Sequence, residues 1–242
     1  FAVYSTFLQR AYDQILQDVC MQKLPVVFAI DRAGLVGSDG ETHHGVFDIS
    51  FLRQMPNITI MSPKNGTELE NMLELAVNLD SPAAIRYPRG NENLYGIGNN
   101  EISYGKSELI IDGEDGMIIA EGKMVYTALE ISKKLLSEGY KVGVLNIRFI
   151  KPLDIDMLKK IGNKYKFVYT IEDNMKIGGL GSGILDYLNS IKSISKVEIF
   201  GYEDEFITHG EIDELLQLTG MDADSIFKSI LCDFRGARYG NE

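Results

Sequence analysis

With 242 residues, 45% of them hydrophobic and 24% charged, the chain has the size and balance of an ordinary soluble globular protein of one or two domains. Its formal net charge of −11 argues against nucleic acid as a partner, because a phosphate backbone attracts a basic surface. No apolar run is long enough for a membrane span, no signal peptide is visible, and Cys20 and Cys232 lack metal-site spacing, so we expect a cytoplasmic protein with reduced thiols and no membrane partner.

The first ninety residues alternate between strand and helix patterns. Residues 1–4 resemble the apolar end of a strand already under way, so we expect the chain to be the carboxyl portion of a longer polypeptide. Ser5 and Thr6 are good cap residues for a helix whose apolar side chains recur at helical spacing up to Val19. The next expected elements are a strand at 24–30, a short helix at 48–54, a strand at 57–61, a helix at 66–77 and a strand at 83–87. This alternation predicts a parallel sheet with helices on both faces.

A second α/β unit follows a segment, residues 91–104, that is rich in Asn and Gly and has no period, as expected of a linker. Strand patterns at 107–111 and 117–120 flank an Asp-Gly-Glu-Asp-Gly turn and predict a β-hairpin. The other expected elements are helices at 124–137, 155–161, 184–190, 211–218 and 224–231, and strands at 141–147, 167–171 and 197–200. The sequence therefore predicts two three-layer α/β units, divided as 1–95 and 96–242.

A polar loop, residues 31–44, directly follows the expected buried strand at 24–30. Three glycines interrupt it, and four of its side chains are suited to chemistry: Arg32, Asp39, Thr42 and His43. Ligands of open α/β sheets bind just beyond the carboxyl ends of the strands. A glycine-bearing polar loop at this position therefore favours a binding or catalytic site over a plain connection.

His43 and Asp39 are the candidate catalytic residues of this loop. His43 could act as a general acid or base, or donate a hydrogen bond to a substrate oxygen, and Asp39 could accept from a substrate hydroxyl. Alternatively, Asp39 caps a turn at Gly40 and His43 packs beside it. The neighbouring His44 points the other way if the segment is extended, so we assign it a structural role.

Arg32 and Arg89 each follow the carboxyl end of an expected parallel strand, and Arg10 lies in the first turns of a helix that starts at the same rim. If the two strands are neighbours, both guanidinium groups reach one rim and favour a phosphate or carboxylate through bidentate hydrogen bonds. The alternative is that each arginine makes a surface salt bridge in an acidic protein.

Tyr4 and Phe7 occupy the first strand-to-helix corner, where they could line the site of a flat heterocycle; the alternative is that both rings belong to the core. The Gly-rich run at 179–183 resembles a dinucleotide fingerprint, but the segment at 172–177 separates it from the preceding strand and the third glycine is misplaced. We therefore expect a close-packed helix start there and no nicotinamide site.

Several motifs closely resemble the 1-deoxy-D-xylulose-5-phosphate synthases, a thiamine-diphosphate family within the transketolase superfamily. They lie in residues 4–14, 28–34, 37–40, 42–43 and 86–90. In the second unit, residues 148–154 and 172–183 resemble the family's carboxyl-terminal domain, a domain shared more loosely with transketolases and 2-oxo acid dehydrogenases. The resemblance implies a mostly parallel pyrimidine-binding domain, incomplete at its N-terminus, followed by a transketolase-type C-terminal domain.

The resemblance also implies a reaction, the first step of the non-mevalonate isoprenoid pathway, whose product feeds thiamine biosynthesis too. Pyruvate condenses with D-glyceraldehyde 3-phosphate to 1-deoxy-D-xylulose 5-phosphate and CO2. By similarity, Phe7 stacks on the cofactor's pyrimidine ring with Tyr4 nearby. Arg32 and Arg89 hold the substrate phosphate with support from Arg10, and Asp39 and His43 contact substrate hydroxyl and carbonyl groups.

The family's diphosphate-binding domain, with its metal-binding Gly-Asp-Gly motif, has no counterpart in this sequence. We therefore expect Mg2+ and the diphosphate to be held by an upstream portion of the same enzyme, assign no metal ligand here, and expect the fragment alone to be inactive and the whole enzyme to be a homodimer. The family commonly has Pro and Gln where this chain has Glu41 and His44.

Two alternative functions remain open from the sequence. The chain could be the small subunit of a split transketolase or of a 2-oxo acid dehydrogenase component, although the Asp-Arg-Ala-Gly pattern around Arg32 favours the synthase. It could also be a non-catalytic dimerisation module, which would leave the polar residues of the loop without a shared role.

Overall fold

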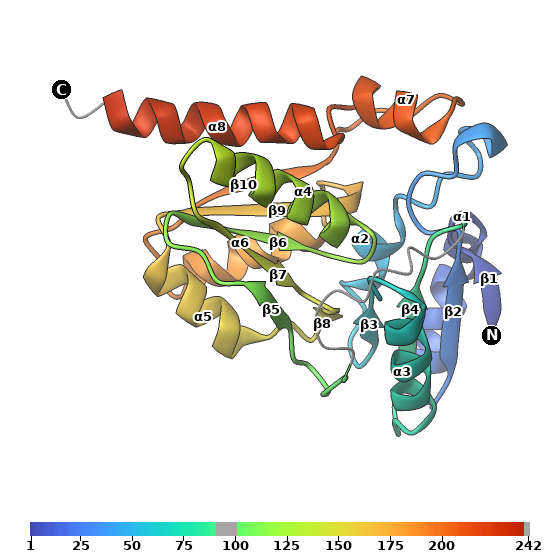
Figure 1. Cartoon of the computed structure of the whole chain (residues 1–242). Coiled ribbons are helices and arrows are strands. Elements are labelled where there is room, and N and C mark those ends of the chain that lie inside the picture. Colours follow the sequence, from blue (N-terminus) through green and yellow to red (C-terminus); the bar gives the residue numbers. More distant parts are fainter. Residues whose placement is uncertain (91–100, 240–242) are drawn as a thin grey trace.

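The computed structural model describes residues 1–90 and 101–239, so most of the linker expected at 91–104 lies outside the described residues. We call residues 1–90 the first unit and residues 101–239 the second unit (Figure 1). The described residues form two five-stranded sheets, each with helices on both faces, which confirms the predicted α/β class.

The first sheet has the strand order β1-β2-β4-β3-β8. Its parallel strands are β1 (Ala2–Tyr4), β2 (Val27–Asp31), β4 (Ala83–Arg86) and β3 (Thr59–Met61). The fifth strand, β8 (Phe149–Lys151), comes from the second unit and pairs antiparallel with β3. The sequence did not predict β8, because a three-residue strand has no period to detect.

The helix expected after Ser5 is present, but its geometry changes along its length. It begins as α1 (Ser5–Leu8), continues through a 3₁₀ turn, η1 (Gln9–Ala11), and ends as a π-helical segment, η2 (Gln14–Cys20). Leu8 and Ile15 still point into the core, as the spacing predicts, and Cys20, beyond the predicted apolar face, is buried with them. The other helices of the first unit are α2 (Asp48–Leu52) and α3 (Gly66–Val77).

The second sheet has the order β10-β9-β6-β7-β5. The strands are β5 (Glu108–Ile111), β6 (Gly116–Ala120), β7 (Val142–Asn146), β9 (Phe167–Met175) and β10 (Lys196–Tyr202). The predicted hairpin is wrong: β5 pairs antiparallel with β7, whereas β6 lies between β7 and β9 and is parallel to both. The reason is burial, because every residue of β6 is buried and needs neighbours on both sides, while half-exposed β5 suits the edge.

Helices cover both faces of the second sheet. Figure 1 shows α4 (Met124–Ser137) and α8 (Ala223–Tyr239) stacked over one face, with α5 (Ile155–Lys164) and α6 (Leu180–Ser190) against the other. The short helix α7 (Ile212–Leu218) lies beside α8 and next to the loop that follows β2. Within the described ranges, no helix is both long enough and apolar enough to cross a membrane.

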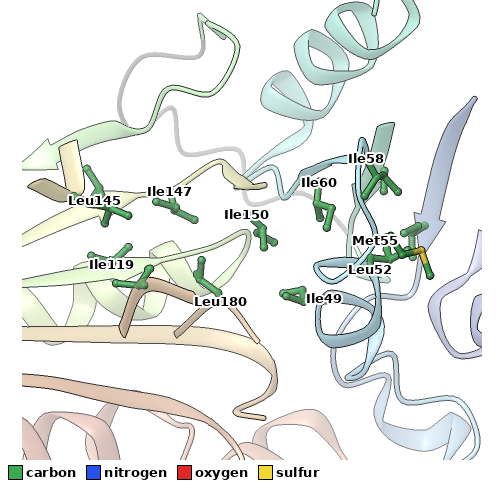
Figure 2. Packing of buried hydrophobic residues seen from close by; sticks show 14 of the residues in the cluster. Ile49, Leu52, Met55, Ile58, Ile60, Ile119, Leu145, Ile147, Ile150 and Leu180 are labelled. Atoms are coloured by element: carbon green, nitrogen blue, oxygen red, sulfur yellow. The ribbon is translucent and has the colours of Figure 1, made fainter. Parts of the chain in front are cut away.

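The two units share one hydrophobic core. Figure 2 shows Ile49, Leu52 and Ile60 of the first unit facing Ile150 and Leu180 of the second. All five side chains are at most 1% exposed. Burial of this kind stabilises by about 1.5–3 kcal/mol per large apolar side chain, so the units are fixed against one another rather than joined only by the linker.

Candidate active site

The candidate site is built on a loop, residues 31–46, that begins at the carboxyl end of β2; we call it the site loop. Gly34 and Gly45 exchange two backbone hydrogen bonds of 2.8 Å, which close the loop at its base. A short 3₁₀ turn, η3 (Gly37–Asp39), carries Asp39, and the backbone N–H of His43 donates to the carbonyl of Gly40 at 2.9 Å. The loop is therefore a closed, hydrogen-bonded structure that holds its side chains in place.

Strand order brings the two predicted arginines to one rim. Strands β2 and β4 are parallel neighbours, so Arg32 and Arg89 both follow the same edge of the sheet. Arg89 Nη1 lies 2.8 Å from Oδ2 of Asp39, and Arg32 Nε lies 3.7 Å from the same oxygen. The hydrogen bond from Arg89, reinforced by the positive charges of both arginines, lowers the pKa of Asp39 below its ordinary value. Asp39 is therefore an ionised acceptor at neutral pH.

Arg32 adopts an unusual backbone conformation, with φ of +58°. Its guanidinium is held by Asp31, at 3.0 Å, and its Cζ atom lies 3.8 Å from the centre of the Tyr4 ring. A non-glycine residue in the left-handed region costs of order 1 kcal/mol and persists only where the surroundings impose it. The strained backbone, the acidic neighbour and the ring together fix the direction of this guanidinium.

Aromatic side chains form the second part of the site, beyond the end of β1. The Tyr4 and Phe7 rings stack with centroids 5.7 Å apart, and the His43 ring meets Phe7 edge-on at 5.4 Å. The hydroxyl of Thr42 lies 3.0 Å from Nδ1 of His43. Tyr4 and Phe7 are half-buried and belong to none of the hydrophobic clusters formed by the described residues, so the alternative of two core rings does not describe them.

Arg10 belongs to this aromatic part of the site. Its Cζ atom lies 5.2 Å from the centre of the Phe7 ring, whereas the ion pairs of Asp39 are made by Arg32 and Arg89. The structure thus separates the three predicted phosphate-binding arginines into a pair around Asp39 and a single cation beside Phe7.

A cavity of about 620 Å³ opens beside Arg32 and Arg89 and extends between the two units. Side chains that the sequence analysis did not single out line it as well: Lys64 and Tyr87 of the first unit, and Lys123, Tyr126, Thr127, Ile212 and Leu216 of the second. Sequence spacing offers no signal for these residues, because their proximity depends on how the two units pack.

The Gly-rich segment at 179–183 is a close-packed helix start, as predicted. The backbone N–H groups of Leu180 and Gly181 donate to the Glu172 carboxylate at 2.6 and 2.9 Å, which satisfies the start of α6. A Cβ on Gly181 would lie 2.5 Å from Ile199, so glycine is required by packing. Strand β9 runs on to Met175, further than expected, so the segment is nearer the strand than the sequence suggested. Burial raises the pKa of Glu172 to about 8.

The remaining histidine and cysteine candidates are structural. His44 is buried, accepts from the backbone N–H of Val36 at 3.3 Å through Nδ1, and places Nε2 3.1 Å from the carbonyl of Thr208. Cys20 is a free thiol in the core, and burial raises its pKa. Among residues 1–90 and 101–239, no three His, Cys, Asp or Glu side chains are grouped so that they could hold a metal ion.

Comparison with known proteins assigns this architecture to a class. Residues 1–93 match the family described as the transketolase pyrimidine-binding domain, and residues 105–226 match the transketolase C-terminal domain. The fold agrees: a split-gene transketolase, solved as an inactive β4 tetramer, superposes with a TM-score of 0.84 at 27% identity, over 95% of this chain and 74% of that one. Transketolase from Campylobacter jejuni shares the fold at a TM-score of 0.76 and 19% identity, over 96% of this chain and 35% of that one. The chain belongs to the transketolase family.

Within that family, the similarity is to one group of enzymes. The chain is 51% identical to the 1-deoxy-D-xylulose-5-phosphate synthase of Caldanaerobacter subterraneus subsp. tengcongensis and 48% identical to that of Aquifex aeolicus, over 98% of its length in both comparisons. These matches confirm the resemblance that the sequence motifs indicated. The chain spans about 38% of the length of these curated relatives.

Proposed function

We propose that this chain supplies the acceptor-binding part of a thiamine-diphosphate-dependent synthase that condenses pyruvate with D-glyceraldehyde 3-phosphate to 1-deoxy-D-xylulose 5-phosphate and CO2. One observation carries the proposal: Arg32 and Arg89, 57 positions apart along the chain, meet at Asp39 beside a cavity. Two guanidinium groups on one rim suit a phosphate monoester, which accepts bidentate charge-assisted hydrogen bonds.

Each site residue has a proposed role within this reaction. Arg32 and Arg89 bind the phosphate of the aldehyde, and Asp39 keeps the two cations oriented and accepts from a substrate hydroxyl. His43 donates a hydrogen bond to the substrate carbonyl oxygen and, as a general acid, gives it a proton when that oxygen becomes a hydroxyl. Because Asp39 is ionised, it acts as an acceptor and not as a proton donor. Arg10 supports the aromatic side of the pocket.

The aromatic pair fits the cofactor that the family implies. Phe7 and Tyr4 are half-buried rings outside the core, next to His43, and a flat pyrimidine gains stacking energy from such rings. When bound, thiamine diphosphate would supply carbanion stabilisation, with Phe7 and Tyr4 beside its pyrimidine ring. We propose that Mg2+ and the diphosphate are held by an upstream portion of the enzyme, that the domains divide at 1–95 and 96–242, and that the enzyme is a cytoplasmic homodimer.

An acceptor assay tests the proposal. A full-length protein containing this chain, supplied with thiamine diphosphate, Mg2+, pyruvate and D-glyceraldehyde 3-phosphate, should release CO2 and form the five-carbon phosphate. The split-gene transketolase relative supports one alternative, in which a ketose phosphate is the donor and no CO2 is released. Turnover of ketose phosphates without pyruvate would reject the synthase, and activity with neither donor would favour the dimerisation module.

A further inference from the structure

Asp173, at the carboxyl end of β9 in the second unit, touches the base of the site loop. Its side chain is 3% exposed. Oδ1 accepts from the backbone N–H of Leu35 at 3.3 Å and from the hydroxyl of Tyr202 at 2.5 Å, and Oδ2 lies 2.6 Å from Nζ of Lys123. A buried carboxylate of the second unit is therefore bonded directly to the loop that carries Arg32, Asp39 and His43.

The loop is shaped around this carboxylate. Gly34 has φ of +80°, and a Cβ at this position would lie 1.7 Å from Oδ2 of Asp173. Gly34 is also half of the bridge with Gly45 that closes the loop. The carboxylate therefore fills the space that a side chain at position 34 would need. The Gly34–Gly45 bridge at the base of the loop is packed directly against Asp173.

The backbone of Asp173 reaches the strand that carries the other arginine. Its carbonyl accepts from Nη2 of Arg86 at 3.1 Å, and Arg86 ends β4, three residues before Arg89. Its N–H donates to the buried Glu121 carboxylate at 2.8 Å, which in turn lies 2.8 Å from Nη1 of Arg86. One residue thus joins the end of β2 to the end of β4.

We propose that Asp173 is a positioning residue for the candidate site: it fixes the distance between Arg89 and the loop residues Arg32 and Asp39. Binding of a phosphorylated acceptor therefore depends on the docked second unit. Lys123 serves this arrangement as the counterion. Burial alone would raise the pKa of Asp173, but the Lys123 ammonium, the Tyr202 hydroxyl and the Arg86 charge outweigh it and hold the pKa below its ordinary value. The carboxylate is therefore charged while it holds the loop.

The inference deepens the proposed function and rests on it for the identity of the acceptor. The test uses the full-length enzyme with Asp173→Asn, which keeps the size of the side chain but removes its charge. KM is measured for glyceraldehyde 3-phosphate, for unphosphorylated glyceraldehyde and for pyruvate. Amide hydrogen exchange of residues 31–46 is measured on the same samples without substrate. Glu172→Gln is the matched control, because Glu172 is the preceding residue, is equally buried, and bonds to α6 instead of the loop.

Asp173→Asn should raise KM for the phosphorylated aldehyde at least about tenfold, while KM for pyruvate and for glyceraldehyde changes less than about threefold, since a small misplacement at a site can cost up to about a hundredfold. Exchange in residues 31–46 should be faster, and Glu172→Gln should change neither readout. Tyr202→Phe removes one hydrogen bond to Oδ1 of Asp173 and should change KM and hydrogen exchange in the same direction, but more weakly. If Asp173→Asn does not fold, Tyr202→Phe tests the positioning role instead.

Equal losses with both aldehydes, or unchanged exchange in the loop, would overturn the positioning role. A wild-type enzyme that does not condense pyruvate with either aldehyde would reject the proposed function. In that case the exchange measurement alone decides the role of Asp173, because it needs no substrate: faster exchange supports the role, and unchanged exchange rejects it.

Discussion

Replacing Arg89 by Ala separates phosphate binding from folding. The Arg89 side chain is 50% exposed and its partner Asp39 is 29% exposed, so solvent screens their ion pair and its contribution to stability is small. A guanidinium that binds a phosphate contributes more, about 1.5–3 kcal/mol, because the hydrogen bonds are charge-assisted. At about 1.4 kcal/mol per tenfold change, KM for D-glyceraldehyde 3-phosphate should rise about 10- to 150-fold.

The assay is steady-state kinetics of the full-length enzyme, with the phosphorylated and the unphosphorylated aldehyde as acceptors. KM for unphosphorylated glyceraldehyde should not change, because this aldehyde has no phosphate group for Arg89 to bind. Arg235→Ala is the matched control. Arg235 lies on the surface of α8, is similarly exposed, at 56%, and pairs with Glu138 at the end of α4. A KM within threefold of the wild-type value for the phosphorylated aldehyde, or an equal rise for both aldehydes, would refute the reasoning.

Three further predictions concern the interior. The folded-state pKa of Glu172, about 8, lies above its ordinary value of 4.5, so the protein should lose stability as the pH rises from about 4.5 to about 8. Glu172→Gln removes this loss, so its free energy of unfolding in urea should exceed that of the wild type by an amount that grows over this pH range towards an upper bound of about 5 kcal/mol. A difference that stays constant with pH would contradict the raised pKa of Glu172. Arg86→Met leaves two buried carboxylates without their cation and should lower the free energy of unfolding by about 3–5 kcal/mol in the same assay. Arg235→Ala should not change it, and a loss below about 1 kcal/mol for Arg86→Met would show that the two carboxylates are solvated. Gly34→Ala should lower stability and acceptor binding, because the added methyl group clashes with the Asp173 carboxylate. Adding Asp173→Ala should therefore restore part of the stability. No recovery would mean that the strained backbone at position 34 alone is responsible.

The part of the site that follows from local pattern could be predicted from the sequence. An apolar run followed at once by a polar, glycine-bearing loop marks the carboxyl end of a strand, and Arg32 and Arg89 follow two such runs. The α/β alternation implies parallel strands, whose carboxyl ends share an edge. Spacing alone left open whether these two strands are neighbours, and the observed order β2-β4 supplies that fact.

The rest depended on contacts between segments far apart in the chain. The turn at 112–116 has the composition of a hairpin, yet burial of β6 on both faces outweighs this local signal and places β7 between β5 and β6. Asp173 looked like an ordinary acidic residue after an apolar strand, because its partner Leu35 lies 138 positions away. Separations of this size carry no periodic signal.

The proposed division of the chain at residue 95 gives neither two separate sheets nor two independent cores, because β8 of the second unit completes the first sheet. Ile60 of β3 is fully buried, and the cluster that encloses it includes Ile150 of β8, the strand that pairs with β3 (Figure 2). Arg86, 3% exposed, lies among the carboxylates of Asp48 in the first unit and Glu121 in the second. A buried cation between two carboxylates tolerates little displacement, because any shift leaves a charge desolvated without its partner. The apolar cluster therefore supplies the affinity between the units, and the buried charges restrict their relative orientation, which is the orientation in which Asp173 meets the site loop.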